Sequence, residues 1–131
     1  MQAVDTNLLV RLFVNDDAAQ AQKVRALFDR HAADDVVLWV ADIVLVELVW
    51  ALDRVYARPR AQIALALHAL AGNATVRLES PAALPEAIAL YAQGPADFAD
   101  ALLAVKAAQA GCEALRSFDK KMRALPGVKL L

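Results

Sequence analysis

Cysteine is almost absent from this chain, because Cys112 is its only cysteine. A single cysteine excludes an intramolecular disulfide and any cysteine-based metal cluster, and its apolar surroundings favour a small core residue. Residues 1–8 also lack the basic and apolar regions of a signal peptide. Together these absences favour a reducing cytoplasmic location.

Long uninterrupted hydrophobic runs are missing too, although 60% of the 131 residues are hydrophobic. No apolar stretch reaches the roughly eighteen charge-free residues that a membrane-spanning helix needs, so no membrane association is expected. Much of the apolar content is alanine, which favours helix. The surplus predicts large buried surfaces and an interface with another chain.

Charge of one sign is not in excess, since 14 basic and 15 acidic residues give a net charge of −1. This balance does not indicate a nucleic-acid-binding protein, although it is compatible with a local basic patch. Glycine is missing from residues 5–8, which follow the first predicted strand. A dinucleotide-binding turn needs glycines there, so that class of module is disfavoured.

Predicted strands and helices alternate along the whole chain. Apolar patterning and turn residues predict strands at 2–5, 36–40, 75–78, 114–118 and 128–130, and helices at 8–13, 17–32, 42–56, 59–71, 80–93, 97–110 and 120–125. Ser80 and Pro81 are expected to start the fifth of these helices. The order predicts a single α/β domain, residues 1–131, with three α/β/α layers and a central, mainly parallel sheet of about five strands.

The segment 41–52 is apolar around a whole helical wheel, which predicts a buried helix with Asp42 as its N-cap. One charge, Glu47, stands in its middle. An ionised glutamate left unpaired in a core costs several kcal/mol or more, so it is protonated or partnered. Two interpretations remain open: Glu47 faces a cleft shared with a cation or a basic side chain, or it is a core residue held by an arginine or a backbone donor.

Further carboxylates fall at the ends of predicted elements. Asp5 ends the first strand, Asp97 and Asp100 open a helix, and Asp119 ends the fourth strand. Parallel strands place their carboxyl ends at one edge of a sheet, so Asp5 and Asp119 can meet there if their strands are neighbours. Clustered acids repel one another unless a cation neutralises them, and all-oxygen ligands suit Mg²⁺ or Mn²⁺.

Each acid also has a purely structural interpretation. Asp97 with Asp100 resembles a capping box, Asp5 can be a turn residue, and Asp119 can cap the last helix. If all of these acids had only structural roles, the charge of Glu47 would remain unexplained. A shared site is therefore favoured.

The motifs Asp5-Thr6-Asn7, the Glu47 helix, Ala96-Asp97-Phe98-Ala99-Asp100-Ala101-Leu102 and Ser117-Phe118-Asp119-Lys120 together resemble a PIN domain, most closely the VapC-type toxins of bacterial toxin–antitoxin pairs. The resemblance covers essentially the whole chain, in the right order. It implies an endoribonuclease dependent on Mg²⁺ or Mn²⁺. It also implies neutralisation by a cognate antitoxin protein, and a homodimer or a higher toxin–antitoxin assembly.

Carried over residue by residue, the resemblance assigns catalysis and metal binding to Asp5, Glu47, Asp100 and Asp119. Asp97 is an additional acid that either assists or only caps its helix. Thr6, Asn7 and Ser117 match the polar residues that support such a site.

Contacts with RNA and with the antitoxin are expected from other residues. Basic candidates for the RNA backbone are Arg11, Arg116, Lys120, Lys121 and Arg123. Trp50, Tyr56 and the helix at 60–70 are candidates to line an antitoxin groove. The alternative for Trp50 and Trp39 is an ordinary place in the core.

Other function classes stay open to different degrees. A receiver-like signalling domain shares the alternating pattern, but it needs an acceptor aspartate after the middle strand, where Leu78-Glu79-Ser80 offers none. A noncatalytic PIN-like RNA-binding module and a DNA nuclease are both compatible with the motifs.

Overall fold

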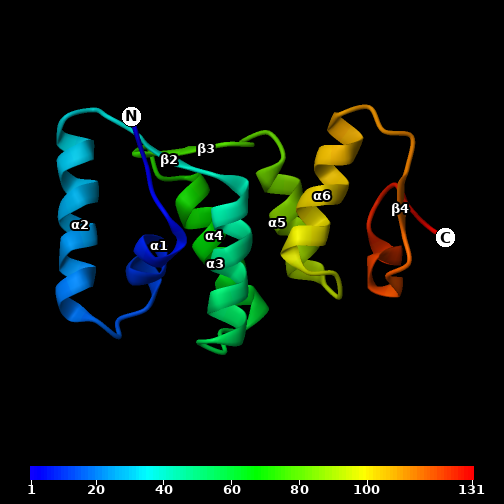
Figure 1. Cartoon of the computed structure of the whole chain (residues 1–131), viewed down its shortest axis with the longest axis horizontal. Coiled ribbons are helices and arrows are strands. Elements are labelled where there is room, and N and C mark those ends of the chain that lie inside the picture. Colours follow the sequence, from blue (N-terminus) through cyan, green and yellow to red (C-terminus); the bar gives the residue numbers. More distant parts are fainter. The chain divides into compact units, whose positions relative to one another are not determined.

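The computed structural model describes residues 1–131, which form two compact units, 1–81 and 82–131, each described by itself (Figure 1). The first unit contains β1 (Gln2–Ala3), α1 (Thr6–Phe13), α2 (Ala18–Ala33), β2 (Leu38–Val40), α3 (Asp42–Arg54), α4 (Arg60–Ala71) and β3 (Val76–Leu78). The second contains α5 (Leu84–Gln93), α6 (Phe98–Gln109), β4 (Leu115–Ser117), the 3₁₀ helix η1 (Lys120–Ala124) and β5 (Val128–Leu130). No helix has the length and apolar character needed to cross a membrane.

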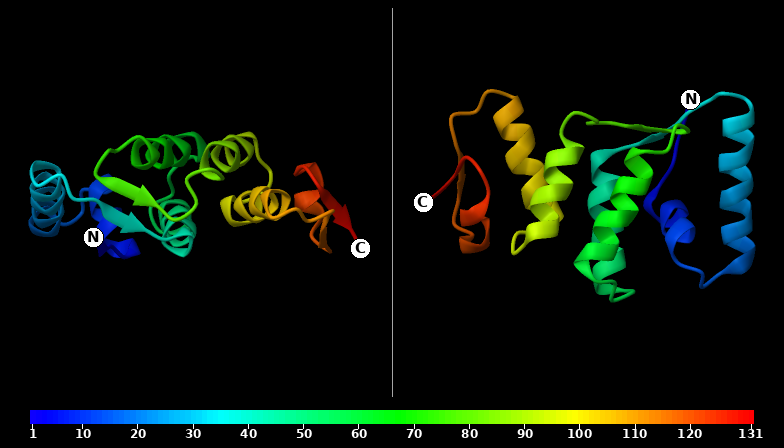
Figure 2. Two further views of the ribbon diagram at one scale, coloured as in Figure 1. Left: turned by 90° about the horizontal axis from the view of Figure 1, so that it is seen from above. Right: turned by 180° about the vertical axis from the view of Figure 1, so that it is seen from behind.

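The sheet of the first unit is parallel, in the order β1-β2-β3. Trp39 at the centre of β2 is in register with Ala3 on β1 and Arg77 on β3, and Figure 2 shows β2 and β3 side by side. Because the strands are parallel, the residues that follow them lie at one edge of the sheet. Asp5 follows β1 and Glu79 follows β3 at this edge.

Helices α1, α3 and α4 build the core of this unit. Helix α1 packs against both α2 and α3, and α3 packs against α4. The fully buried side chains include Leu9, Leu38, Leu45, Leu48, Ile63 and Leu67. The apolar residues of α1 and α3 therefore fix how the amino-terminal end of α1 lies against the middle of α3.

The prediction that α3 is buried on every side is wrong. Leu45, Leu48 and Leu52 face inward, whereas Ile43 is 66% exposed and Trp50 is 61% exposed. An apolar pattern on all sides of a helix indicates that each face can be buried. It does not predict which faces a neighbouring element covers. The predicted N-cap is also one residue late: the cap is Ala41, and the amide of Asp42 donates to Glu79 Oε1 at 3.0 Å.

In the second unit, α5 packs against α6, and β4 pairs in parallel with β5. Tyr91 and Phe98 join the two helices through an edge-to-face contact with ring centroids 6.0 Å apart. Helix α5 starts at Leu84, and not at Pro81 as predicted. The hydroxyl of Ser80 donates to Asp42 Oδ2 at 2.7 Å, so a distant acid takes the group that was expected to cap this helix.

The predicted α/β class, with parallel strands among helices, is confirmed. The strands form a three-stranded and a two-stranded sheet where one sheet of about five was expected. None of these strands is longer than three residues, too short for their patterning to reveal which strands pair. Cys112 is exposed, so its predicted place in the core is wrong. A single domain spanning residues 1–131 remains a prediction.

Candidate functional site

Asp5 and Glu47 approach the same end of α1. Asp5 caps this helix, with Oδ1 accepting the amide N–H of Leu8 at 3.2 Å. The next residue, Thr6, donates its hydroxyl hydrogen to Glu47 Oε2 at 2.9 Å. The motif that begins at Asp5 is therefore connected directly to the predicted glutamate, although 41 positions separate Thr6 from Glu47.

These residues line a cavity of about 420 Å³, whose walls are Asp5, Thr6, Asn7, Glu47, Trp50 and Ala51. Glu47 is exposed, so its interpretation as a core residue is wrong. The structure places Glu47 in a cavity wall, as the alternative interpretation predicted. Its hydrogen-bond partner is a hydroxyl, where a basic side chain or a cation was expected.

A second group of acids lies in the 82–131 unit. Asp97 caps α6, because its Oδ1 accepts the amide N–H of Asp100 at 2.9 Å. Asp100 itself is partly buried. Burial, the neighbouring Asp97 charge, a hydrogen bond with the Asp97 side chain and the charge of Asp119 raise the pKa of Asp100 to about 6. The three carboxylates are thus close enough to oppose one another's ionisation.

Asp119 is held by the turn between β4 and η1. Its Oδ1 accepts the amide N–H of Lys121 at 2.9 Å, so Asp119 caps η1 as one interpretation predicted. Its own amide donates to Ser117 Oγ at 3.0 Å, and the Ser117 hydroxyl donates to Met122 Sδ at 3.3 Å. Ser117 therefore supports the backbone at Asp119, while its role in supporting a catalytic site stays a prediction.

These acids fit a divalent cation in chemistry, although neither unit contains three His, Cys, Asp or Glu side chains already arranged to bind one. Capping a helix occupies only one oxygen of a carboxylate. Because an ionised carboxylate offers about four lone-pair sites, a capping acid can still bind a cation. The raised pKa of Asp100 shows that added positive charge is favoured beside Asp97 and Asp119. Oxygen-only ligands of this kind suit Mg²⁺ or Mn²⁺.

The predicted RNA-contacting residues differ in how free they are. Arg11 forms an ion pair with Asp16 at 2.6 Å and donates through Nε to Gln20 Oε1 at 2.7 Å. The pKa of Arg11 is raised, chiefly by its hydrogen bond with Tyr56. In contrast, Lys120 is exposed beside Asp119, and the exposed Arg116 donates only a long hydrogen bond, from Nη2 to the Leu130 carbonyl at 3.5 Å. The geometry therefore favours Arg116 and Lys120 over Arg11 as contacts for a phosphate chain.

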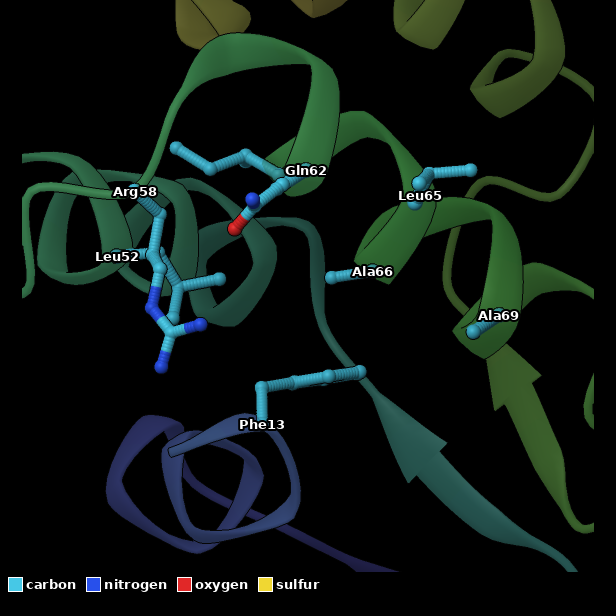
Figure 3. Close-up of a pocket in the computed structure, with 8 residues that line it drawn as sticks. Phe13, Leu52, Arg58, Gln62, Leu65, Ala66 and Ala69 are labelled. Atoms are coloured by element: carbon cyan, nitrogen blue, oxygen red, sulfur yellow. The ribbon is translucent and has the colours of Figure 1, made fainter. Parts of the chain in front are cut away.

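A separate apolar cavity of about 290 Å³ lies between α1, α3 and α4 (Figure 3). Phe13, Leu52, Ile63, Leu65, Ala66 and Ala69 line it, together with the polar Arg58 and Gln62. The helix at 60–70, predicted to line an antitoxin groove, lines this cavity. Trp50 lines the Glu47 cavity instead, and the hydroxyl of Tyr56 donates to Asp16 Oδ2 at 3.0 Å.

The sequence reasoning missed two residues of the first unit. Glu79 follows β3 at the same sheet edge as Asp5 and anchors the start of α3 through the amide of Asp42. Its position directly after a strand was the available signal. Trp50 was not placed in the acidic cavity, although it lies three residues after Glu47, a spacing that puts both on one helix face.

Comparisons with known proteins identify the family of the chain. A family model described as the PIN domain matches residues 3–128, a span that includes Asp5, Glu47, Asp97, Asp100 and Asp119. The chain is 26% identical to a VapC ribonuclease from Aquifex aeolicus (strain VF5) over 125 aligned residues. This alignment covers 95% of the present chain and 92% of the relative. Because the family model matches nearly the whole chain, the resemblance to a PIN domain is confirmed, and the protein belongs to the PIN domain family.

Proposed function

We propose that this PIN domain protein is a divalent-metal-dependent endoribonuclease that acts as the toxin of a toxin–antitoxin pair. The observation that carries the proposal is the group Asp97, Asp100 and Asp119, in which burial and mutual repulsion raise the pKa of Asp100 to about 6. A cation relieves that repulsion. The similarity to a VapC ribonuclease supports RNA as the substrate class.

In this proposal Asp5, Glu47, Asp100 and Asp119 hold Mg²⁺ or Mn²⁺, and Asp97 assists while capping α6. When bound, such an ion activates water as a nucleophile and stabilises negative charge on phosphate oxygens. The fit rests on the all-carboxylate donor set and on the preference of Asp100 for nearby positive charge.

The chain's own residues orient these carboxylates and control their protons. Thr6 fixes one oxygen of Glu47 through its hydroxyl. The amide of Leu8 fixes one oxygen of Asp5, and the amide of Lys121 fixes one oxygen of Asp119. Asp100 must lose its proton before its carboxylate can bind a cation, so activity should rise with pH around the pKa of this residue.

The expected reaction is in-line attack of water on the phosphorus atom of an RNA phosphodiester. The new bond joins the water oxygen to phosphorus, and the bond from phosphorus to the 3′ oxygen breaks. The products are then a 5′ phosphate and a 3′ hydroxyl, and the 2′ hydroxyl does not act as nucleophile. The exposed cations of Arg116 and Lys120 are proposed to bind the RNA backbone.

We assign the antitoxin to the apolar cavity between α1, α3 and α4. Its walls include Leu65, which is 67% exposed and therefore available to cover apolar surface on a partner. Arg58 also lines this cavity, and its cation can pair with an acidic group of the antitoxin. A homodimer is proposed on the resemblance alone.

The decisive experiment is cleavage of total cellular RNA by purified protein, with Mn²⁺ or Mg²⁺ and with EDTA, beside Asp5→Asn and Asp100→Asn. We expect cleavage that needs the ion and is lost in both variants, with 5′-phosphorylated products. Thermal unfolding gives a readout besides activity, because Mn²⁺ should raise the Tm of the wild type more than that of Asp100→Asn. Equal behaviour of all three proteins would exclude these acids as the active site.

The alternative function is a noncatalytic RNA-binding module. It is favoured by one result of the same experiment: RNA binding in the absence of any ion-dependent cleavage. Cleavage of single-stranded DNA at a rate similar to that of RNA would instead indicate a nuclease that does not distinguish the two sugars.

A further inference from the structure

The exposed face of α3 carries a regular row of side chains. Ile43, Glu47, Trp50 and Arg54 are all exposed, and they follow one another at spacings of four, three and four residues. Such spacing places them along one face of a helix. The opposite face, with Leu45, Leu48 and Leu52, is buried in the core. The row is therefore a surface feature that the packing of the first unit does not require.

Trp50 is the unusual member of this row. Tryptophan has the largest aromatic side chain, yet Trp50 is 61% exposed. It also lines the 420 Å³ cavity that contains Asp5, Thr6, Asn7 and Glu47. An exposed indole beside acids that are candidates for phosphodiester cleavage has an obvious ligand chemistry, because every nucleobase has a flat face on which an aromatic ring can stack.

We propose that Trp50 is a positioning residue that stacks on a nucleobase of single-stranded RNA next to the phosphate presented to Glu47. This inference rests on the proposed ribonuclease function and names a contact that holds its substrate. At a rise of about 1.5 Å per residue, Trp50 lies roughly 4.5 Å along the helix axis from Glu47. A base on the indole therefore places its own backbone beside the acidic cavity.

Arg54 extends the same row by one further turn. Its side chain is 72% exposed, and its contact with Asp53 is a long, exposed ion pair of 3.5 Å, which contributes little. The guanidinium is thus available to a phosphate roughly 6 Å beyond Trp50 along the helix axis. The succession of acid, indole and cation matches a nucleotide chain better than an apolar protein segment. The mainly apolar cavity at Leu52 and Leu65 suits a protein segment better.

The test measures binding of a short single-stranded RNA of mixed sequence to the full chain with Mn²⁺ present. Every protein carries Asp100→Asn, so that the RNA is not consumed during the titration. We compare Trp50→Leu, which removes the ring, Trp50→Phe, which keeps one, and the matched control Ile43→Ala. Ile43 is a similarly exposed apolar residue in the same row, but it does not line the cavity.

We expect Trp50→Leu to weaken binding about tenfold, Trp50→Phe to weaken it less than threefold, and Ile43→Ala to leave it unchanged. A ribose-phosphate chain of equal length without bases should bind all four proteins alike. In the background without Asp100→Asn, the change in Trp50→Leu should appear mainly as a higher KM for cleavage. Circular dichroism checks that each variant is folded.

Other outcomes overturn the inference. Equal RNA affinity of Trp50→Leu and the parent, or an equal loss for the chain without bases, excludes base stacking. If Trp50→Leu binds RNA normally but changes from dimer to monomer in light scattering, the indole covers a second copy of the protein. Failure of the wild type to cleave RNA would overturn the nuclease proposal, while this binding comparison would still decide the role of Trp50.

Discussion

Thr6 Oγ1 lies 2.9 Å from Glu47 Oε2, so the first residue of α1 orients the glutamate in the middle of α3. One hydrogen bond therefore links two sequence motifs that were assigned to one site on separate grounds. An exposed hydrogen bond of this kind contributes about 1 kcal/mol or less to stability, so its main effect is on geometry.

Replacing Thr6 with valine tests that role, because valine keeps the branched shape and removes the hydroxyl. We expect Thr6→Val to lower the rate of RNA cleavage about tenfold and to change the free energy of unfolding by less than about 1 kcal/mol. The measurements are single-turnover cleavage and urea denaturation. Thr6→Ser, which keeps the donor, should retain most of the activity; a similar loss in both variants would contradict an orienting role.

Asp97 combines a structural cap with a charge, and two substitutions separate these properties. Asp97→Asn keeps a good N-cap and should preserve stability, whereas Asp97→Ala should cost about 1 kcal/mol. Both remove the carboxylate beside Asp100 and should lower the pKa of Asp100. Thermal unfolding and titration followed by NMR measure the two effects. A loss of Mn²⁺ affinity in Asp97→Asn would identify Asp97 as a ligand.

The raised pKa of Asp100 predicts how metal-free stability changes with pH. The pKa is about 6 in the folded protein and has an ordinary value of 3.8, so the folded state binds more protons between these limits. The stabilisation from protonated Asp100 is therefore present below about pH 4 and is lost as the pH rises through 6. Solvent screening reduces this effect to about 1 kcal/mol.

In EDTA, the wild type should lose this stability relative to Asp100→Asn between pH 4 and pH 7, as measured by urea denaturation. Asp29→Asn, at an exposed acid on α2, provides a matched control for the loss of one charge. Parallel pH profiles for the wild type and Asp100→Asn would show that Asp100 titrates normally.

The contrast between Arg11 and Lys120 predicts different effects on RNA binding. Lys120→Gln removes an exposed cation and should reduce the salt dependence of binding by about one unit of slope. Arg11→Gln breaks the ion pair with Asp16 and should destabilise the fold only slightly, with little change in that slope. Affinities measured over a series of salt concentrations decide between them. A large change of slope in Arg11→Gln would restore Arg11 as an RNA contact.

The sequence allowed most helices and the caps at Asp97 and Asp119 to be predicted, because both depend on local signals. The Asp97 cap is an example. An aspartate directly before an apolar helical pattern predicts that its side chain accepts a backbone N–H in the first turn of that helix. The exposure of Glu47 and Trp50 could not be predicted, because it depends on which faces of α3 other helices cover. The start of α5 was misplaced for a related reason, since Ser80 binds Asp42, which lies 38 residues away.

Three acids of the proposed site, Asp5, Asp97 and Asp119, each accept a backbone N–H as helix caps. Those amide dipoles offset part of the negative charge even when no ion is bound. Folding is therefore expected not to depend on the metal, unlike that of proteins whose chains collapse only around their ion. Depletion of the metal in a cell would then silence the protein without lowering its abundance, and restored supply would reactivate molecules that are already folded.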